Sequence, residues 1–200
     1  MKEKIIEVSL ERFLQFGIRS MTIKKLVEPL GISTKTVYKY FGSKEELLAE
    51  CLKVLYAGYH NEFVVKMNQK DSPVFKLLSL FYSSMGKDFG VTRAFFHDLN
   101  YYYPELQNAE LNKIGRDYGD VLTPTIQSGI DEGYFNKYIN AEVVLKGIGT
   151  LYALITRSEE YKNYKGSPYT LFENLVEVYI RGMCSEKGIK EIENKPYKHE

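Results

Sequence analysis

The residues best placed to do chemistry form a basic, hydroxyl-rich cluster, T-K-T-V-Y-K-Y, between Thr34 and Tyr40. Lysine ammonium groups bind phosphates and can donate to guanine, while threonine and tyrosine hydroxyls suit phosphate oxygens. A solvated helix face would also carry charges, but here the cations around the cluster are opposed by a single acid, Glu28. The cations between residues 18 and 44 are Arg19, Lys24, Lys25, Lys35, Lys39 and Lys44. Such a local excess favours a surface that faces a polyanion, because each phosphate contact releases counterions.

No catalytic or metal-binding constellation accompanies the cluster. The G-x-S-x-G, phosphate-loop and H-E-x-x-H patterns are absent, so we expect neither an enzyme nor a cofactor or metal site. Cys51 and Cys184 lack a C-x-x-C context and are predicted to be two buried thiols. His97 beside Asp98 is the one histidine pair to note, as a solvent or interface pair or, alternatively, a polar anchor in a ligand pocket.

Helix signals on either side of Gly31 predict how the cluster is positioned. Thr22 and Ser33 are good N-caps for two short helices, and Gly31 between them can adopt the left-handed backbone of a sharp turn. Ile32 and Val37 can then pack inward against the preceding helix, leaving the basic and hydroxyl residues outside. This is a helix-turn-helix arrangement, whose second helix enters the major groove of DNA.

The next element is a long helix that begins with the capping box S-x-x-E of Ser43 and Glu46. Its apolar periodicity runs from Lys44 to about residue 68. A helix over residues 3–16, ended by Gly17, precedes the helix-turn-helix. Three short helices and the start of a fourth therefore form a predicted N-terminal DNA-binding domain over residues 1–48.

The motif T-x-x-x-L-x-x-x-x-G-I-S-x-x-T-V-Y-x-Y-F-x-S-K-E-E-L resembles the DNA-binding region of the TetR family of bacterial transcriptional regulators. The resemblance implies that Thr36, Tyr38 and Lys44 contact phosphates, that Thr34 and Lys35 face base edges, and that Tyr40 lies at the groove. With the residues that cap or flank the two helices, the predicted DNA-binding set is Thr22, Lys24, Ser33, Thr34, Lys35, Thr36, Tyr38, Lys39, Tyr40 and Lys44.

Four residues depart from the family pattern. Val27 and Leu30 replace small alanines, and Lys35 replaces a glycine at a base-reading position. Pro29 lies near the end of the second helix, where its ring removes a backbone hydrogen bond. These departures predict a changed operator preference rather than a loss of DNA binding.

The rest of the chain is also predicted to be helical, which makes the fold class all-α. Asp71, Ser72 and Pro73 mark the start of five helical segments, over residues 73–89, 92–102, 105–132, 141–158 and 168–185, with a kink or break expected at Pro124. We assign residues 49–185 to a C-terminal effector-binding and dimerisation domain. Residues 186–200 are predicted to be a polar, frayed tail.

The sequence contains no run of about 18 apolar residues, and its N-terminus reads as an amphipathic helix rather than a signal peptide. A cytoplasmic location without membrane partners is therefore expected.

Two further surfaces are predicted in the C-terminal domain. Its aromatic residues can fill a core or line a cavity for a small apolar or aromatic effector, and the candidates for such a pocket are Tyr82, Phe96, His97, Tyr101, Tyr118 and Tyr152. The family resemblance implies that the last two helices form a homodimer interface, although the same faces could close a monomer core. The candidates for that interface are Val144, Ile148, Leu151, Ile155, Leu171, Leu175, Val178 and Tyr179.

Together these features predict a dimeric transcriptional repressor that binds a palindromic DNA operator and is released by an unknown small effector. One alternative is a DNA-binding factor of the same fold without a small-molecule switch. Another is a helical enzyme or binding protein with a degenerate DNA-binding domain.

Overall fold

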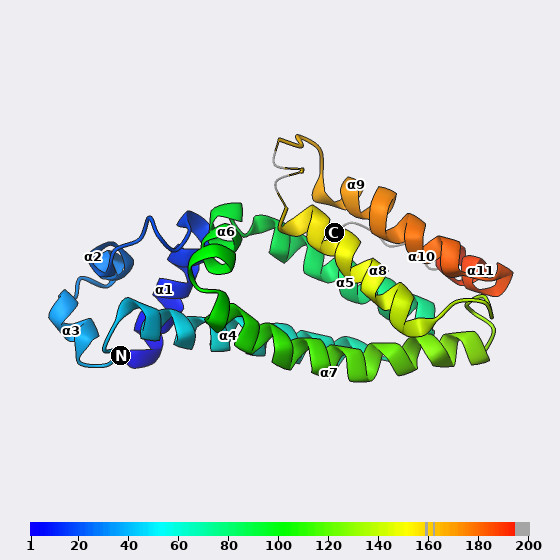
Figure 1. The fold of residues 1–200 in the computed structure, drawn as a ribbon, viewed down its shortest axis with the longest axis horizontal. Coiled ribbons are helices and arrows are strands. Elements are labelled where there is room, and N and C mark those ends of the chain that lie inside the picture. The colour runs from blue at the N-terminus through cyan, green and yellow to red at the C-terminus, as the bar shows by residue number, and fades with distance from the viewer. Residues whose placement is uncertain (159, 162, 195–200) are drawn as a thin grey trace. The chain divides into compact units, whose positions relative to one another are not determined.

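The structure, a computed structural model, describes residues 1–158, 160–161 and 163–194. The predicted all-α fold is confirmed: the described residues form helices and loops, with one isolated antiparallel bridge between Phe135 and Cys184. The helices, labelled in Figure 1, are α1 (Lys2–Phe16), α2 (Ile23–Val27), α3 (Thr34–Tyr38), α4 (Lys44–Met67), α5 (Pro73–Gly90), α6 (Arg93–Tyr102), α7 (Pro104–Asp131), α8 (Ala141–Thr156), α9 (Pro168–Phe172), α10 (Val178–Met183) and α11 (Glu186–Asn194).

The chain divides into two compact units. Unit 1 contains Met1–Glu62 and Gly90–Ile114, and unit 2 contains Phe63–Phe89 and Gly115–Glu200. Each unit has its own hydrophobic core. The sequence placed a domain boundary at residue 48, whereas the compact unit around the helix-turn-helix also takes in α6, because Phe95, Phe96 and Leu99 are buried in its core.

Unit 1 contains the short helices that the sequence predicted. The helix α1 ends at Gly17, whose φ of 81° lies in the left-handed region that favours glycine. The helix α2 ends at Val27 and continues as a single 3-10 turn, Glu28–Leu30, that carries Pro29. The tighter turn accommodates the proline, which cannot donate the backbone hydrogen bond that a longer α-helix would require.

The capping box at the start of α4 is present, with one difference from the expected pattern. The backbone N–H of Glu46 donates to Ser43 Oγ over 3.0 Å, as predicted. The Glu46 carboxylate accepts a hydrogen bond from the N–H of Gly42, one residue before Ser43, over 2.7 Å. The first bond satisfies an N–H group that a helix N-terminus leaves without an intrahelical partner, and the second ties the residue before the cap to the first turn.

Unit 2 is built from α5, the C-terminal part of α7, α8 and the last helices. The α8 helix packs against α9 and against a π-helical turn, Glu173–Glu177, that joins α9 to α10 (Figure 1). Aromatic contacts link α5 to its neighbours: the Tyr82 ring stacks on Tyr169 with the centroids 4.6 Å apart, and Tyr152 donates a 2.7 Å hydrogen bond to the buried Asp88 carboxylate.

The structure differs from two expectations for this part of the chain. The helix α7 continues as one element through Pro124, from Pro104 to Asp131, so of the kink or break expected there the break is wrong. Residues 186–194 form α11 rather than a frayed tail, because Ile192, which is only 4 % exposed, and the partly buried Ile189 pack against the core of unit 2. The remainder of the predicted tail, residues 195–200, lies outside the described residues.

Candidate nucleic-acid interface

Local hydrogen bonds orient the short helix α3. Thr22 Oγ1 accepts from the N–H of Lys25, and Ser33 Oγ accepts from the N–H of Thr36, so both predicted N-caps are confirmed. Between them Gly31 adopts a φ of 63°, the left-handed conformation that the turn required. Val37 is fully buried in the core of unit 1 and therefore determines which face of α3 points outward.

The outward face of α3 carries the hydroxyl and basic side chains singled out in the sequence. The side chains of Tyr38 and Tyr40 are 54 % and 41 % exposed, although large aromatic residues are usually buried. Most of the other predicted DNA-binding residues are exposed as well: Thr22, Lys24, Ser33, Thr34, Lys35 and Lys39. Thr36 is half-buried, and its hydroxyl lies 3.1 Å from that of Ser33. The geometry offers a small convex surface of donors that fits a major groove.

The six cations around the helix-turn-helix differ in how they are held. Lys44 Nζ donates to the backbone oxygen of Ile18 over 2.6 Å, and Arg19 donates to the Tyr102 hydroxyl over 2.6 Å. Lys25 makes a longer 3.4 Å bond to a backbone oxygen. The ammonium groups that lie open on this surface are those of Lys24, Lys35 and Lys39.

Sequence reasoning missed the role of Asp98 within unit 1. Its Oδ2 accepts the backbone N–H groups of Ile18 and Arg19 at 2.9 and 2.7 Å, although these residues are about eighty positions away in the chain. The only sequence signal was an acidic residue in an otherwise apolar stripe of α6. That signal cannot identify the partner, because side-chain periodicity says nothing about which distant backbone faces the helix.

A groove of about 650 Å³ lies in unit 2 between α5, α7 and α8. Phe81, Tyr118, Leu122 and Leu145 provide apolar surface, and the charged lining residues are Asp120, Glu142 and Lys146. Its volume is that of a site for a small organic molecule, and its lining combines apolar walls with a few charged groups.

The structure distributes the six predicted pocket residues over both units. Tyr118 lines the groove and stacks on Phe63 with the ring centroids 4.1 Å apart. Tyr152 contacts the groove residue Phe81, at a centroid distance of 5.4 Å, and Tyr82 is packed in the core, where burial raises the pKa of its phenol. The other three, Phe96, His97 and Tyr101, belong to α6 in unit 1.

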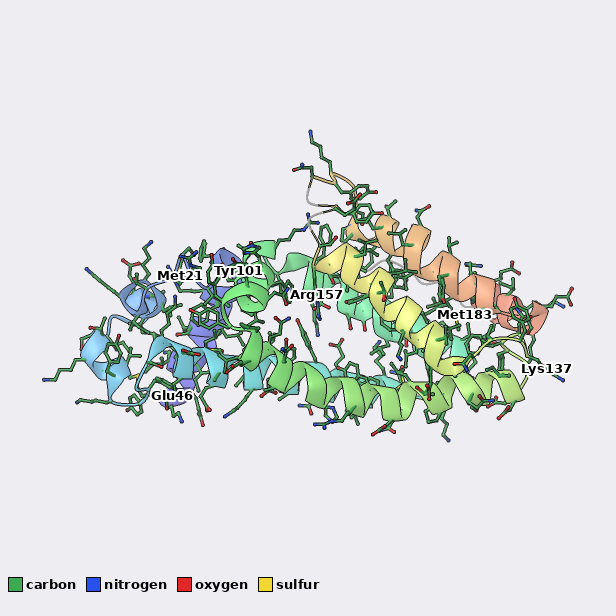
Figure 2. The ribbon with its side chains drawn as sticks, in the orientation of Figure 1. Met21, Glu46, Tyr101, Lys137, Arg157 and Met183 are labelled. Atoms are coloured by element: carbon green, nitrogen blue, oxygen red, sulfur yellow. The ribbon has the colours of Figure 1, made fainter. Side chains whose placement is uncertain are left out.

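The unit 1 members of that set differ in exposure. Phe96 is buried in the core, whereas Tyr101 is 72 % exposed. Figure 2 shows Tyr101 on α6, and its ring stacks on the exposed His97 imidazole with centroids 6.0 Å apart. These two residues therefore form an outer surface of α6 rather than the lining of the groove described above.

The eight predicted interface residues fall into two groups. Val144, Ile148, Ile155 and Leu171 are buried inside unit 2 and close its own core. Leu151, Leu175 and Tyr179 are half-buried, and Val178 is 57 % exposed. Val143 on α8, which the sequence did not single out, is 64 % exposed. The open apolar positions on α8 and α10 are thus Val143 and Val178.

Two negative observations apply to the part of the chain that the structure describes. No cluster of three or more His, Cys, Asp and Glu side chains has the arrangement of a metal site there. Among the helices in that part, none combines the length and apolarity needed to cross a membrane.

Comparison with known proteins gives a consistent result. Residues 5–51 match the family model described as "Bacterial regulatory proteins, tetR family". The chain is 21 % identical over 152 residues to the HTH-type transcriptional repressor KstR2 of Mycobacterium tuberculosis, an alignment that covers 72 % of this chain and 74 % of that protein. It is 16 % identical over 148 residues to KstR2 of Rhodococcus jostii, with 72 % of each chain covered.

Solved structures share the fold. A TetR transcription regulator from Haloarcula marismortui superposes with a TM-score of 0.76 at 20 % identity, covering 92 % of this chain and 98 % of that one. A putative transcriptional regulator from Saccharomonospora viridis in complex with choline gives 0.77 at 16 % identity, with the same two coverages. The fatty acid degradation regulator FadR from Bacillus halodurans gives 0.69 at 17 % identity, covering 90 % and 94 %.

The family match over residues 5–51 contains the capped turn, the buried Val37 and the exposed face of α3, which together are the parts of a DNA-reading helix-turn-helix. A regulator of this type binds DNA and is not an enzyme. Residues 5–51 of this chain thus match the DNA-binding region of the TetR family of bacterial regulatory proteins, and the whole chain is similar to repressors and solved regulators of that family.

Proposed function

We propose that the protein is a ligand-responsive repressor that binds a palindromic operator as a homodimer and is released by a small effector. The observation that carries the proposal is the outer face of α3, where Lys35, Tyr38 and Lys39 are exposed around the buried Val37. Threonine, tyrosine and lysine side chains on one helix face supply phosphate and base-edge contacts together. The relatives in Rhodococcus jostii and Mycobacterium tuberculosis are named repressors, which supports repression over activation.

The effector is proposed to bind the groove of unit 2. The walls of Phe81, Tyr118 and Leu145 suit an apolar or aromatic body, and Asp120, Glu142 and Lys146 can orient a polar end. The names of similar structures agree with small organic ligands, since one was solved with choline and another is a regulator of fatty acid degradation. Binding would release the operator only if the effector has a higher affinity for the state that binds DNA poorly.

Dimerisation follows from the size of the reading surface. One five-residue helix presents few contacts, whereas two such helices about 34 Å apart can read successive major grooves of a two-fold site. The open apolar positions Val143 and Val178 on α8 and α10 supply a candidate interface. A protein that acts on chromosomal operators in a bacterium is expected in the cytoplasm.

The first experiment is selection of bound sites from random DNA, followed by affinity measurements with the selected duplex. We expect a palindrome with half-sites one helical turn, or a multiple of it, apart. No enrichment of any sequence over random DNA would contradict the proposed DNA-binding function.

The second experiment tests the effector groove with Gly149→Leu. Gly149 lines the groove, and a Cβ added there meets no atom within 4 Å, so the helix backbone has room for a side chain that begins at this wall of the groove. With a panel of fatty acids, quaternary amines and aromatic acids, an effector that weakens operator binding by the parent should have little effect on the variant. The matched control is Thr150→Leu, at an exposed position of α8 outside the groove. If the effector weakens operator binding by both variants as much as by the parent, the effector binds outside this groove. If no compound weakens operator binding by the parent, a DNA-binding factor of the same fold without a small-molecule switch is favoured.

A further inference from the structure

We propose that Asp98 of α6 and Lys44 of α4 clamp the loop between α1 and α2, and that Lys44 acts in this clamp rather than at a DNA phosphate. The loop is Gly17–Ser20, which leads into the N-cap of the helix-turn-helix. The inference rests on the proposed DNA-binding surface of α3 and assigns two positioning residues that lie outside that surface.

Asp98 holds the loop through its backbone. One carboxylate oxygen, Oδ2, accepts the N–H groups of Ile18 and Arg19 at 2.9 and 2.7 Å. Asp98 is 8 % exposed, so water does not compete for these bonds as it would at the surface. Hydrogen bonds to a charged acceptor are about twice as strong as neutral ones, and an N–H left without an acceptor in a buried position is costly.

Lys44 holds the same loop through the backbone carbonyl group of Ile18. Its Nζ donates to the backbone oxygen of Ile18 over 2.6 Å and lies 5.8 Å from the centre of the Phe13 ring. Burial lowers the pKa of the ammonium, and the nearby negative charge of Asp98 opposes that change. The ammonium group is therefore directed at α1 and the loop, and the peptide of Ile18 is held on its N–H side by Asp98 and on its carbonyl side by Lys44.

Neighbouring contacts leave the loop little freedom to shift against α6. A side chain on Gly17, built at its φ of 81°, would meet the Cβ of Ala94 at 3.0 Å, so α6 approaches the loop as closely as glycine allows. The N–H of Thr92 donates to the backbone oxygen of Leu14 over 2.9 Å. Arg19 donates to the Tyr102 hydroxyl and its guanidinium lies 4.2 Å from the centre of that ring.

The clamp gives α6 control of the reading helix. Residues 17–20 are followed directly by the Thr22 cap of α2, and α2 packs against α3. A change in the position of α6 would therefore be transmitted to the start of the helix-turn-helix through two hydrogen bonds to one carboxylate. A phosphate-binding lysine, by contrast, would need its ammonium group free to face the DNA.

The salt dependence of operator binding separates the two roles of Lys44. The slope of log K against log salt concentration is negative, and removing one phosphate contact from each DNA-binding domain of a dimer reduces its magnitude by about 1.8, at about 0.9 per contact. We expect Lys44→Met to weaken binding to the selected operator about tenfold without changing this slope. The matched control is Lys39→Met, on the exposed face next to α3, which should reduce the magnitude of the slope by about 1.8.

A double-mutant cycle then tests whether Lys44 and Asp98 act together. Asp98→Asn keeps an acceptor oxygen for the loop but removes the charge, and we expect about tenfold weaker operator binding with an unchanged thermal midpoint within a few degrees. Combining it with Lys44→Met should cost little more than either change alone, because both disturb the same loop. Circular dichroism of each variant confirms that it is folded.

If Lys44→Met reduces the magnitude of the salt slope as much as Lys39→Met does, Lys44 contacts a DNA phosphate and the proposed clamp is overturned. Losses that multiply to about a hundredfold in the double variant would also overturn it, since independent sites add in free energy. If Lys39→Met leaves the slope unchanged, the proposed DNA-binding surface of α3 has failed instead, so the two proposals can fail separately.

Discussion

At the scale of single residues, backbone conformation and burial determine how the DNA-reading surface is held. Gly31 and Gly17 both have positive φ values, 63° and 81°, and both end a helical element of unit 1. They differ in their surroundings, because a side chain at Gly31 would meet nothing within 4 Å whereas one at Gly17 would meet Ala94. The pair therefore separates the cost of a strained backbone from the cost of a steric clash.

We expect Gly31→Ala to lower the free energy of unfolding by about 1 kcal/mol, the cost of placing a side chain in the left-handed region. Gly17→Ala should lower it by about 2 to 4 kcal/mol, because the packing against α6 must open as well. Urea titration followed by circular dichroism measures both. Equal losses for the two variants would show that the close approach of Ala94 does not contribute.

The two cysteines give a prediction about pH. Burial raises the pKa of each thiol to about 12, so the folded protein keeps both protons while the unfolded chain loses them near its ordinary value of about 8.5. The folded state binds more protons in this interval, and stability is therefore lost as pH rises from about 9 to about 12. Below about pH 7 both states keep their thiol protons, and the thiols contribute no pH dependence.

Native protein at pH 8 should react slowly with a thiol reagent and react rapidly once unfolded in urea. The Cys51→Ala and Cys184→Ala double variant should show a shallower loss of stability between pH 9 and pH 10.5 than the parent. The slopes are compared rather than the absolute stabilities, since alanine leaves a small cavity. If stability falls equally steeply with pH in the parent and the double variant, the buried thiols are not the source of the pH dependence.

At the scale of the helix, two prolines illustrate how position determines cost. Pro29 lies at the start of the 3-10 turn after α2, where a missing N–H costs little. Pro124 lies inside α7, which nevertheless continues to Asp131. The interior proline removes one helical hydrogen bond and crowds the preceding turn.

Pro124→Ala should therefore raise the free energy of unfolding by about 1 to 3 kcal/mol, since alanine restores the hydrogen bond and the helix propensity. Pro29→Ala is the matched control and should change it by less than about 0.5 kcal/mol. Thermal and urea unfolding of both variants test the difference. A destabilised Pro124→Ala variant would indicate that the proline ring, which lines the groove of unit 2, contributes more by packing than it costs in the helix.

At the scale of the whole molecule, the proposed dimer depends on apolar side chains that the single chain leaves open. Val178 is 57 % exposed on α10, and a carboxylate there would be costly to bury in an interface. We expect Val178→Glu to be a monomer by light scattering. It should bind the selected operator about a hundredfold more weakly, because the second DNA-binding domain is no longer held near its half-site by the first.

The control for this change is Val121→Glu on α7, where the valine is 38 % exposed and lies on a different helix from α8 and α10. That variant should remain a dimer with the affinity of the parent. If Val178→Glu also stays dimeric, the homodimer interface must use another surface of unit 2.

Much of the local structure followed from residue type and spacing. Thr22, Ser33 and Ser43 were predicted as N-caps because their hydroxyls satisfy nearby N–H groups, and each does so. The left-handed turn at Gly31 and the buried Val37 followed from the same short-range reasoning. These interactions join residues at most a few positions apart, so the information needed to predict them is contiguous in the chain.

Long-range placement could not be predicted in this way. The aromatic stripe of α6 indicated a buried face but not its neighbours, and Phe96 proved to belong to the core of unit 1. The helix α11 was missed because its apolar face consists of only two isoleucines one turn apart, Ile189 and Ile192, in an otherwise polar segment.

The sequence by itself thus determined the fold class, the family resemblance of the N-terminal region and the composition of the surface that is proposed to read DNA. Only the tertiary structure decided that Asp98 accepts the backbone of the loop after α1, and that Lys44 is directed at the same loop from the start of α4. The physical reason is distance along the chain: caps and turns are satisfied by neighbours, whereas the partner of a buried carboxylate is selected by how entire helices pack.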